Sequence, residues 1–296
     1  MLAKGLPVKI AIQGELGSNS HMAALAMLEN GPGARAIEIA ACATSAEVLE
    51  RVVGGSVDAA VLPIENSLHG SVAEHYDLLL AQPVRIVRES LMRIRHNLIV
   101  RPGVAPADIK RVMSHPVALS QCRGWLAAHP WFEVVNFYDT AGSVKHLMAE
   151  ELDDTAGIAP ELAARQYGAE VLVAGIEDHA ENYTRFHLLV REGEDIRVGK
   201  PTSDDSPSDM GHPANKASLA FSLEHRPGTL VLALEEFARA KVNLTKIESR
   251  PVPGTPWEYV FFVDVRFESA EQIDAALAGV KRHCHMLKEL GRYVAA

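Results

Sequence analysis

Residues 182–190 read Asn182-Tyr183-Thr184-Arg185-Phe186-His187-Leu188-Leu189-Val190, a polar opening that leads into an apolar run. This pattern predicts a strand whose start offers a hydroxyl, a guanidinium and an aromatic ring, groups suited to a small, charged, ring-shaped ligand. Because side chains alternate along a strand, Thr184 and Phe186 share one face, and Arg185 points to the other unless the backbone is bulged. Taken alone, the stretch favours an edge strand with an exposed arginine over a binding site.

Outward from this strand, segments of strand and helix length alternate along the chain. From residue 8 to residue 192 the two types follow each other repeatedly, which predicts an α/β domain with largely parallel sheets. Residues 200–209 are polar and contain proline, as is typical of a linker. Beyond residue 216 the predicted order is β-α-β-β-α-β, the ferredoxin-like split unit. We therefore expect an α/β domain over residues 7–192, a linker over 193–215 and an α+β domain over 216–296.

Composition and charge narrow the class of protein. The chain has 296 residues, 48% of them hydrophobic and 23% charged, which is the balance of an ordinary globular protein with two domains. A net charge of −9 without a basic stripe argues against a nucleic-acid partner. No apolar run approaches the length of about 18 residues that a membrane span needs, and the first residues lack the apolar core of a secretory signal, so we expect a cytoplasmic protein. Three widely spaced cysteines argue against a disulfide framework or a cysteine metal site.

Hydroxyl and amide side chains recur where predicted strands end. They are Ser18, Asn66, Ser114, Thr140 and Thr184. Ligands of α/β proteins bind where strands end, so this recurrence is the strongest indication of a site that the residues give by themselves. The chain has no GxGxxG or Walker loop, no HExxH pair and no GxSxG elbow, which disfavours dinucleotide, zinc-protease and esterase chemistry.

Several of these positions also have plainer interpretations. The turn Gly14 to His21 is equally consistent with an anion site at a helix start and with a simple N-cap by Ser20. Asn66 or Ser67 could each be a turn or cap residue. Gln121 could point to solvent or into a cleft, and the basic segment from Arg93 to His96 is interpreted as a solvated face.

Taken together and in order, these motifs resemble the prephenate dehydratases that carry a C-terminal ACT regulatory domain. The resemblance spans nearly the whole chain and rests on these motifs: Gly14–Ala24, Pro63–Ser67 with Gly70–Val72, Ser114–Pro116 with Ala118-Leu119 and Gln121-Cys122, Asp139–Ala141, Asn182 with Thr184–Phe186, Gly228-Thr229-Leu230 and Glu248-Ser249-Arg250-Pro251.

The resemblance implies a two-lobed, periplasmic-binding-protein-like catalytic domain followed by a ferredoxin-like ACT domain. It implies conversion of prephenate to phenylpyruvate with neither a metal nor an organic cofactor. Thr184 is the implied catalytic residue, a hydrogen-bond donor to the leaving hydroxyl. The implied substrate-binding residues are Ser18, Asn66, Ser67, Ser114, Gln121, Thr140, Arg185 and Phe186.

Phenylalanine is the implied effector. Its implied site consists of Gly228, Thr229, Leu230, Glu248, Ser249 and Arg250, and the expected assembly is a homodimer or homotetramer. Two alternatives stay open. The chain could prefer arogenate, the amino analogue of prephenate, or it could be a non-catalytic two-lobed sensor that binds an amino acid or another solute.

Overall fold

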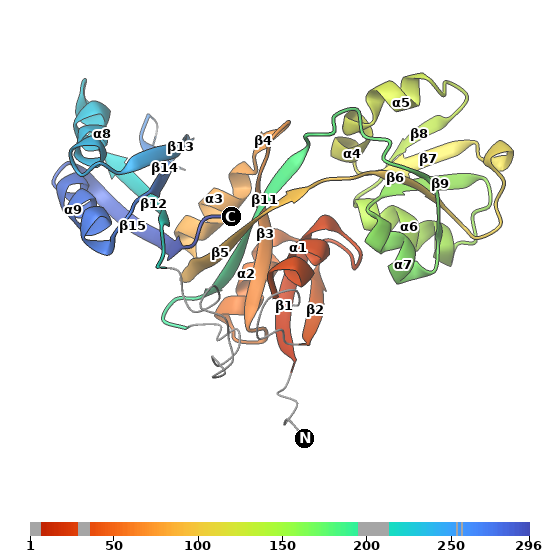
Figure 1. Cartoon of the computed structure of the whole chain (residues 1–296), viewed down its shortest axis with the longest axis horizontal. Coiled ribbons are helices and arrows are strands. Elements are labelled where there is room, and N and C mark those ends of the chain that lie inside the picture. Colours follow the sequence, from red (N-terminus) through yellow and green to blue (C-terminus); the bar gives the residue numbers. More distant parts are fainter. Residues whose placement is uncertain (1–6, 29–35, 195–212, 253, 256) are drawn as a thin grey trace.

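The structure is a computed structural model of the whole chain, and it describes residues 7–28, 36–194, 213–252, 254–255 and 257–296. Three sheets define three bodies that lie in a row (Figure 1). The first lobe is in the middle, the second lobe lies on one side of it, and the body formed by the C-terminal residues lies on the other. Much of the linker predicted over 193–215 lies outside the described residues.

The first lobe is built on a six-stranded sheet of order β2-β1-β3-β11-β5, with β4 paired to β3. Its strands are β1 (Val8–Gln13), β2 (Ile37–Cys42), β3 (Ala59–Asn66), β4 (Gly70–Ser71), β5 (Val84–Arg93) and β11 (Tyr183–Arg191). Its helices are α1 (Asn19–Leu28), α2 (Ser45–Val53) and α3 (Ala73–Ala81). The strand predicted around Thr184 is confirmed, but it is an interior strand of this sheet and not an edge strand, because β3 and β5 flank it.

The second lobe carries a five-stranded sheet of order β10-β6-β9-β7-β8. The strands are β6 (Asn97–Val100), β7 (Arg111–Ser114), β8 (Glu133–Asn136), β9 (Thr155–Ala159) and β10 (Glu170–Ala174). The helices are α4 (Pro116–Gln121), α5 (Arg123–Ala127), α6 (Thr140–Ala149) and α7 (Glu161–Tyr167).

The prediction of largely parallel sheets is wrong for the strands on which the chain changes lobes. β1, β2 and β3 run parallel, as do β7, β8 and β9, but β11 is antiparallel to both of its main neighbours and β6 is antiparallel to β9 and β10. The chain leaves the first lobe after β5 and returns to it on β11, so β11 must run back against β5. A hydrogen bond of 2.7 Å from the Ile94 amide to the Asn182 carbonyl joins the two crossing segments.

The C-terminal body has the predicted order β-α-β-β-α-β. Its antiparallel sheet, of order β13-β14-β12-β15, consists of β12 (Lys216–Leu223), β13 (Asn243–Pro251), β14 (Tyr259–Arg266) and β15 (Cys284–Tyr293), with helices α8 (Thr229–Arg239) and α9 (Ala270–Lys281). One face of the sheet packs on these helices. The other face extends the core of the first lobe, where Phe262 packs against Tyr76 with ring centroids 5.1 Å apart.

A lysine strengthens this docking. Lys288 on β15 donates to the main-chain carbonyls of Leu79 and Leu80, which lie in the last turn of α3, where helix carbonyls have no partner within the helix. It also donates to the carbonyl of Gln82, just past the helix, which accepts from the Val84 amide as well. Burial lowers the pKa of Lys288. Within the described residues, no helix is both long and apolar enough to cross a membrane.

Candidate active site

A cavity of about 640 Å³ lies between the first and second lobes, where strands of both lobes end. Six residues expected from the sequence line it: Ser18, Asn66, Gln121, Thr140, Thr184 and Phe186. Ser67, Ser114 and Arg185 are absent from its described lining. The volume falls in the range of sites that enclose a small molecule.

Thr184 and Asn66 form a pair whose hydrogen-bond directions are fixed. They are opposite each other on β11 and β3, and the Asn66 Nδ2 group donates to the Thr184 Oγ1 atom at 2.9 Å. The Asn66 Oδ1 atom accepts from the main-chain amides of Leu68 and His69, both at 3.0 Å, so Nδ2 must face Thr184. Because Oγ1 already accepts a hydrogen, the hydroxyl hydrogen of Thr184 is available for donation to a ligand.

Gln121 points into the cleft, where two histidines hold it. Its Oε1 atom lies 2.7 Å from the Nε2 atom of His96, and its Nε2 group lies 3.2 Å from the Nδ1 atom of His69. An amide oxygen only accepts, so the Nε2 atom of His96 carries the hydrogen. Burial lowers the pKa of His96, which keeps the ring neutral, and its Nδ1 atom has no hydrogen-bond partner among the described residues.

The interpretation of the segment from Arg93 to His96 as a solvated face is therefore wrong for His96. The sequence suggested a solvated basic face, but only 2% of His96 is exposed and it lines the cavity. Its neighbour Arg93 ends β5 and forms an ion pair of 3.5 Å with Glu177. The sequence signal that could have revealed His96 is its position between two strands, β5 and β6, where the chain crosses from the first lobe to the second.

A carboxylate of the first lobe is held by the second lobe at one side of the cavity. Glu15 accepts from the Tyr138 Oη atom at 2.8 Å and from the Lys145 Nζ atom at 2.9 Å. Burial would raise the pKa of Glu15, but the hydrogen bonds from Lys145 and Tyr138 outweigh it and lower the pKa. Sequence reasoning missed Glu15, Tyr138 and Lys145 because the two lobes bring them together over more than 120 residues of chain.

The turn before α1 is glycine-rich because the second lobe lies against it. Gly17 has φ of +87°, and a Cβ atom there would lie 2.6 Å from the Cα atom of Ala163 on α7. Helix α1 begins at Asn19, and the Oγ atom of Ser18 accepts from the His21 amide at 3.4 Å. The residue in the N-cap position is thus Ser18, and the alternative of a cap by Ser20 is wrong.

Two expected site residues, Ser67 and Ser114, form hydrogen bonds with the main chain and do not line the cavity. The Ser67 Oγ atom donates to the Glu181 carbonyl at 3.2 Å and accepts from the Tyr183 amide at 3.0 Å, which ties the end of β3 to the returning crossing. The Ser114 Oγ atom is buried and donates to the Ile158 carbonyl at 2.6 Å. Both hydroxyls end a strand, as expected, but they bond the main chain beside them.

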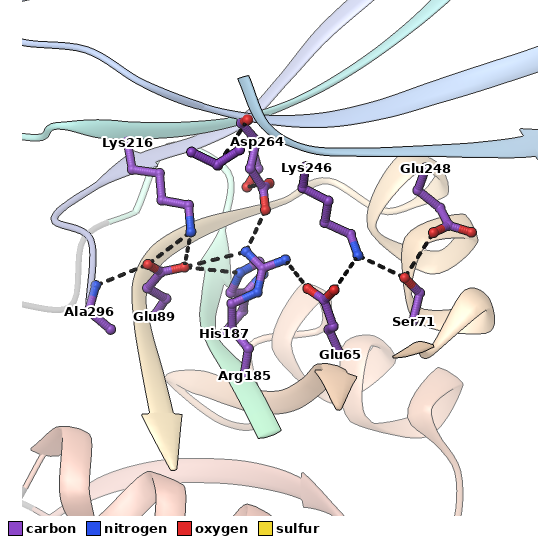
Figure 2. Close-up of polar contacts among 12 residues, drawn as sticks. Glu65, Ser71, Glu89, Arg185, His187, Lys216, Lys246, Glu248, Asp264 and Ala296 are labelled. Atoms are coloured by element: carbon purple, nitrogen blue, oxygen red, sulfur yellow. Dashed lines mark hydrogen bonds and ion pairs between the residues drawn. The ribbon is translucent and has the colours of Figure 1, made fainter. Parts of the chain in front are cut away.

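Arg185 points away from the cavity, as the alternation of side chains along β11 requires. Its guanidinium lies 2.5 Å from Asp264 of the C-terminal body, 2.9 Å from Glu65 and 3.5 Å from Glu89 (Figure 2). The charge of Asp264 and its hydrogen bond to Arg185 outweigh burial and raise the pKa of the guanidinium. The expectations that Arg185 binds substrate, or that it is an exposed edge residue, are both corrected: it is a buried ion-pair partner between two bodies.

Other charges complete this interface cluster. Lys216 pairs with Glu89 at 2.7 Å, and Lys246 pairs with Glu65 at 3.0 Å (Figure 2). Three cations, Arg185, Lys216 and Lys246, thus meet three carboxylates, Glu65, Glu89 and Asp264. His187 is fully buried beside them, and burial, followed by the charge of Arg185, lowers its pKa well below the ordinary value, so it is neutral.

The expected effector residues divide into two groups. Gly228, Thr229 and Leu230 line a second cavity of about 280 Å³ together with Trp257, Tyr259 and Phe261. Glu248 and Arg250 lie elsewhere, since their side chains contact the first lobe: Glu248 accepts from Ser71 at 2.9 Å, and Arg250 pairs with Asp77 at 2.6 Å. Ser249 is on the opposite face of β13 and is exposed. Within one chain these three residues therefore do not join the cavity at Gly228.

The described residues include no group of three or more histidine, cysteine, aspartate and glutamate side chains placed to hold a metal ion.

Comparison with known proteins gives consistent matches over the chain. The sequence model of the family described as prephenate dehydratase matches residues 10–194. A relative from Arabidopsis thaliana, arogenate dehydratase/prephenate dehydratase 2 of the chloroplast, is 38% identical over 99% of this chain and 74% of its own length. A prephenate dehydratase from Arthrobacter aurescens, solved in complex with L-Phe, is 34% identical with a TM-score of 0.82 over 98% of this chain and 90% of that one. A structure described as GqqA, a novel type of quorum quenching acylase, is 30% identical with a TM-score of 0.81 over 97% of this chain and 98% of that one.

Proposed function

The chain belongs to the prephenate dehydratase family, and from this premise we propose that it converts prephenate to phenylpyruvate, carbon dioxide and water in the cavity between the lobes. In this reaction the ring carboxylate leaves as carbon dioxide and its bonding electron pair enters the ring. The carbon–oxygen bond opposite breaks, and the hydroxide that departs takes a proton from the solvent to become water. Aromatisation drives the reaction, so the protein has to align the two leaving groups and stabilise the departing oxygen.

The pair of Thr184 and Asn66 is the observation that carries the proposal. The Thr184 hydroxyl donates a hydrogen bond to the departing oxygen as negative charge develops there. Asn66 polarises this hydroxyl by donating to its oxygen. Phe186 lines the same cavity and supplies an apolar wall for the ring.

The carboxylates of the substrate need partners other than Arg185. One is the start of α1, where Ser18, Asn19 and Ser20 line the cavity and the helix dipole favours an anion. Another is Lys145, which lines the cavity and whose half-exposed ammonium is paired with Glu15 at the surface of the lobe interface. Thr140 and Gln121 supply further hydrogen-bonding groups.

One assay tests this function. The purified protein is given prephenate and arogenate in parallel, and phenylpyruvate and phenylalanine are measured. Turnover of prephenate supports the proposal, and a strong preference for arogenate would reassign the substrate to the amino analogue. No turnover of either by the folded protein would reject the catalytic function and favour the sensor.

The similarity to a structure described as an acylase raises a second chemistry, since acyl transfer usually needs an activated nucleophile. Ser45 and His75 have this arrangement, with the Ser45 Oγ atom 2.6 Å from the His75 Nε2 atom and the ring bonded through Nδ1 to the Pro63 carbonyl. However, only 1% of Ser45 is exposed, so an acyl substrate does not reach it. The buried position of Ser45 favours the dehydratase.

Regulation by phenylalanine is the second part of the proposal. The cavity at Gly228 combines a helix start with the rings of Trp257, Tyr259 and Phe261, which suits an amino acid with an aromatic side chain. The similar A. aurescens protein was solved with L-Phe. Val231, which lines this cavity, is an exposed apolar residue, as are Leu232 of α8 and Ile247 of β13. These residues suit association into a homodimer or homotetramer, in which Ser249 of a neighbouring subunit would approach the cavity.

Calorimetric titration tests the effector site. Trp257→Ala removes an exposed ring of the cavity, and Trp131→Ala removes another exposed tryptophan ring, in the second lobe, as a control. Phenylalanine should bind to the wild type and to the control, and its affinity should fall in Trp257→Ala. Equal affinities in all three proteins would place the effector elsewhere.

A further inference from the structure

Two neighbouring pairs on strands β3 and β11 face opposite sides of the same sheet. Thr184 is opposite Asn66, and their side chains meet in the cavity between the lobes. Arg185 is opposite Glu65, and their side chains meet beneath the C-terminal body at 2.9 Å (Figure 2). The ion pair therefore lies on the opposite face of the sheet from the proposed catalytic pair, one residue along the same two strands.

Two strands of the C-terminal body contact the ion pair between Arg185 and Glu65. Asp264 of β14 lies 2.5 Å from Arg185, and Lys246 of β13 lies 3.0 Å from Glu65. Asp264 is itself fixed by the Ser218 Oγ atom, which donates to it at 2.6 Å. The side chains of Arg185 and Asp264 are only 10% and 6% exposed, so water does not replace these bonds.

Main-chain hydrogen bonds between β3 and β11 constrain these two pairs only weakly. The register between β3 and β11 shifts between Arg185 and Phe186, so the regular ladder of hydrogen bonds is interrupted directly after the two pairs. Consecutive Cα atoms are about 3.8 Å apart across a rigid peptide, so a displacement of the main chain at Arg185 is passed to Thr184.

We propose that Asp264 is a positioning residue for the dehydratase reaction, which acts through Arg185 to hold the Thr184 hydroxyl in line with the departing oxygen. This inference rests on the proposed function. Asp264 and the cavity at Gly228 share a strand, because Tyr259 and Phe261 of β14 line that cavity three to five positions before Asp264. β14 thus connects the proposed effector site to the catalytic pair without an intervening element.

The decisive variant is Asp264→Asn, which keeps an oxygen for Arg185 but removes the charge. Asp77→Asn is the matched control, because it makes the same change in another ion pair between the first lobe and the C-terminal body, with Arg250, away from the two strand pairs. Asp264→Glu tests rescue, since it retains the carboxylate. Melting temperature and near-ultraviolet circular dichroism report whether each variant is folded.

Asp264→Asn should lower kcat for prephenate by about 10- to 100-fold, because small misplacements of a catalytic group have effects of this size, while KM stays within about twofold. Asp77→Asn should leave both constants within about twofold of the wild type, and Asp264→Glu should recover part of the lost kcat. A kcat of Asp264→Asn equal to that of the control, or a rise in KM alone, would overturn the inference.

A milder variant covers the case in which Asp264→Asn does not fold. Ser218→Ala removes one hydrogen bond to Asp264 and should lower kcat about two- to fivefold without a change in KM. An unchanged kcat in Ser218→Ala then counts against the inference. A wild type that is inactive on prephenate and arogenate rejects the proposed function itself, whereas an active wild type with an equally active Asp264→Asn rejects only the role of Asp264.

Discussion

Replacing Thr184 by valine is the most direct test of the proposed mechanism. The two side chains have the same shape, so the change exchanges a hydroxyl for a methyl group at a position that is 8% exposed. The Asn66 Nδ2 group loses its bond to Thr184 but keeps the Asn182 Oδ1 atom at 2.7 Å and the Tyr183 carbonyl at 3.2 Å. The free energy of unfolding should therefore fall by only about 1 kcal/mol, the net value of one hydrogen bond.

The effect on catalysis should be much larger. Loss of one donor to a developing negative charge typically lowers kcat by about 10²- to 10³-fold, which corresponds to about 2.7–4 kcal/mol in the barrier. Initial rates of phenylpyruvate formation over a range of prephenate concentrations give kcat and KM for the variant. Thr155→Val is the control, since it makes the same exchange on a buried strand of the second lobe. If folded Thr184→Val keeps a kcat within about threefold of the wild type, the hydroxyl does not act on the leaving group.

Three further outcomes are expected. Asn66→Asp should lower kcat by about 10²-fold in the same assay, because a carboxylate would accept the Thr184 hydrogen and withdraw it from the substrate, and an undiminished kcat would contradict the assigned hydrogen-bond direction. The free energy of unfolding should fall as the pH drops below about 6.5, by up to about 1.4 kcal/mol per pH unit for each of His75, His96 and His187, because burial lowers their pKa values and the unfolded chain takes up protons that the folded chain does not. Thermal unfolding from about pH 8 to pH 5 measures this, and a flat profile would contradict it. Gly17→Ala should raise KM and lower the melting temperature, because its φ of +87° strains alanine by about 1–2 kcal/mol and the new Cβ atom would collide with Ala163; unchanged values would show that the lobes do not need this close approach.

Sequence reasoning succeeded where the determining interactions are local. The alternation along residues 183–191 correctly separated Thr184 from Arg185, and the order β-α-β-β-α-β predicted beyond residue 216 is the observed one. It could not choose among hydroxyls at strand ends, because only the folded main chain shows that Ser114 bonds the Ile158 carbonyl.

Reasoning from the sequence failed where distant segments meet. Glu15 and Lys145 acquire their roles only when the two lobes face each other, and the partner of Arg185 lies in a different body of the protein. The strand directions of the crossing segments were also beyond reach, since hydrophobic periodicity predicts that β11 exists but not which way it runs.

The lysine that closes the end of α3 gives the molecule an internal chemical reporter. An amine reacts with acylating reagents only when it is deprotonated and accessible, and the Lys288 nitrogen is occupied by three carbonyls of the first lobe. When the C-terminal body separates from the first lobe, this nitrogen enters water and becomes reactive. The rate at which Lys288 is labelled, read by mass spectrometry against the exposed lysines of the same chain, therefore measures how often the two bodies part in solution.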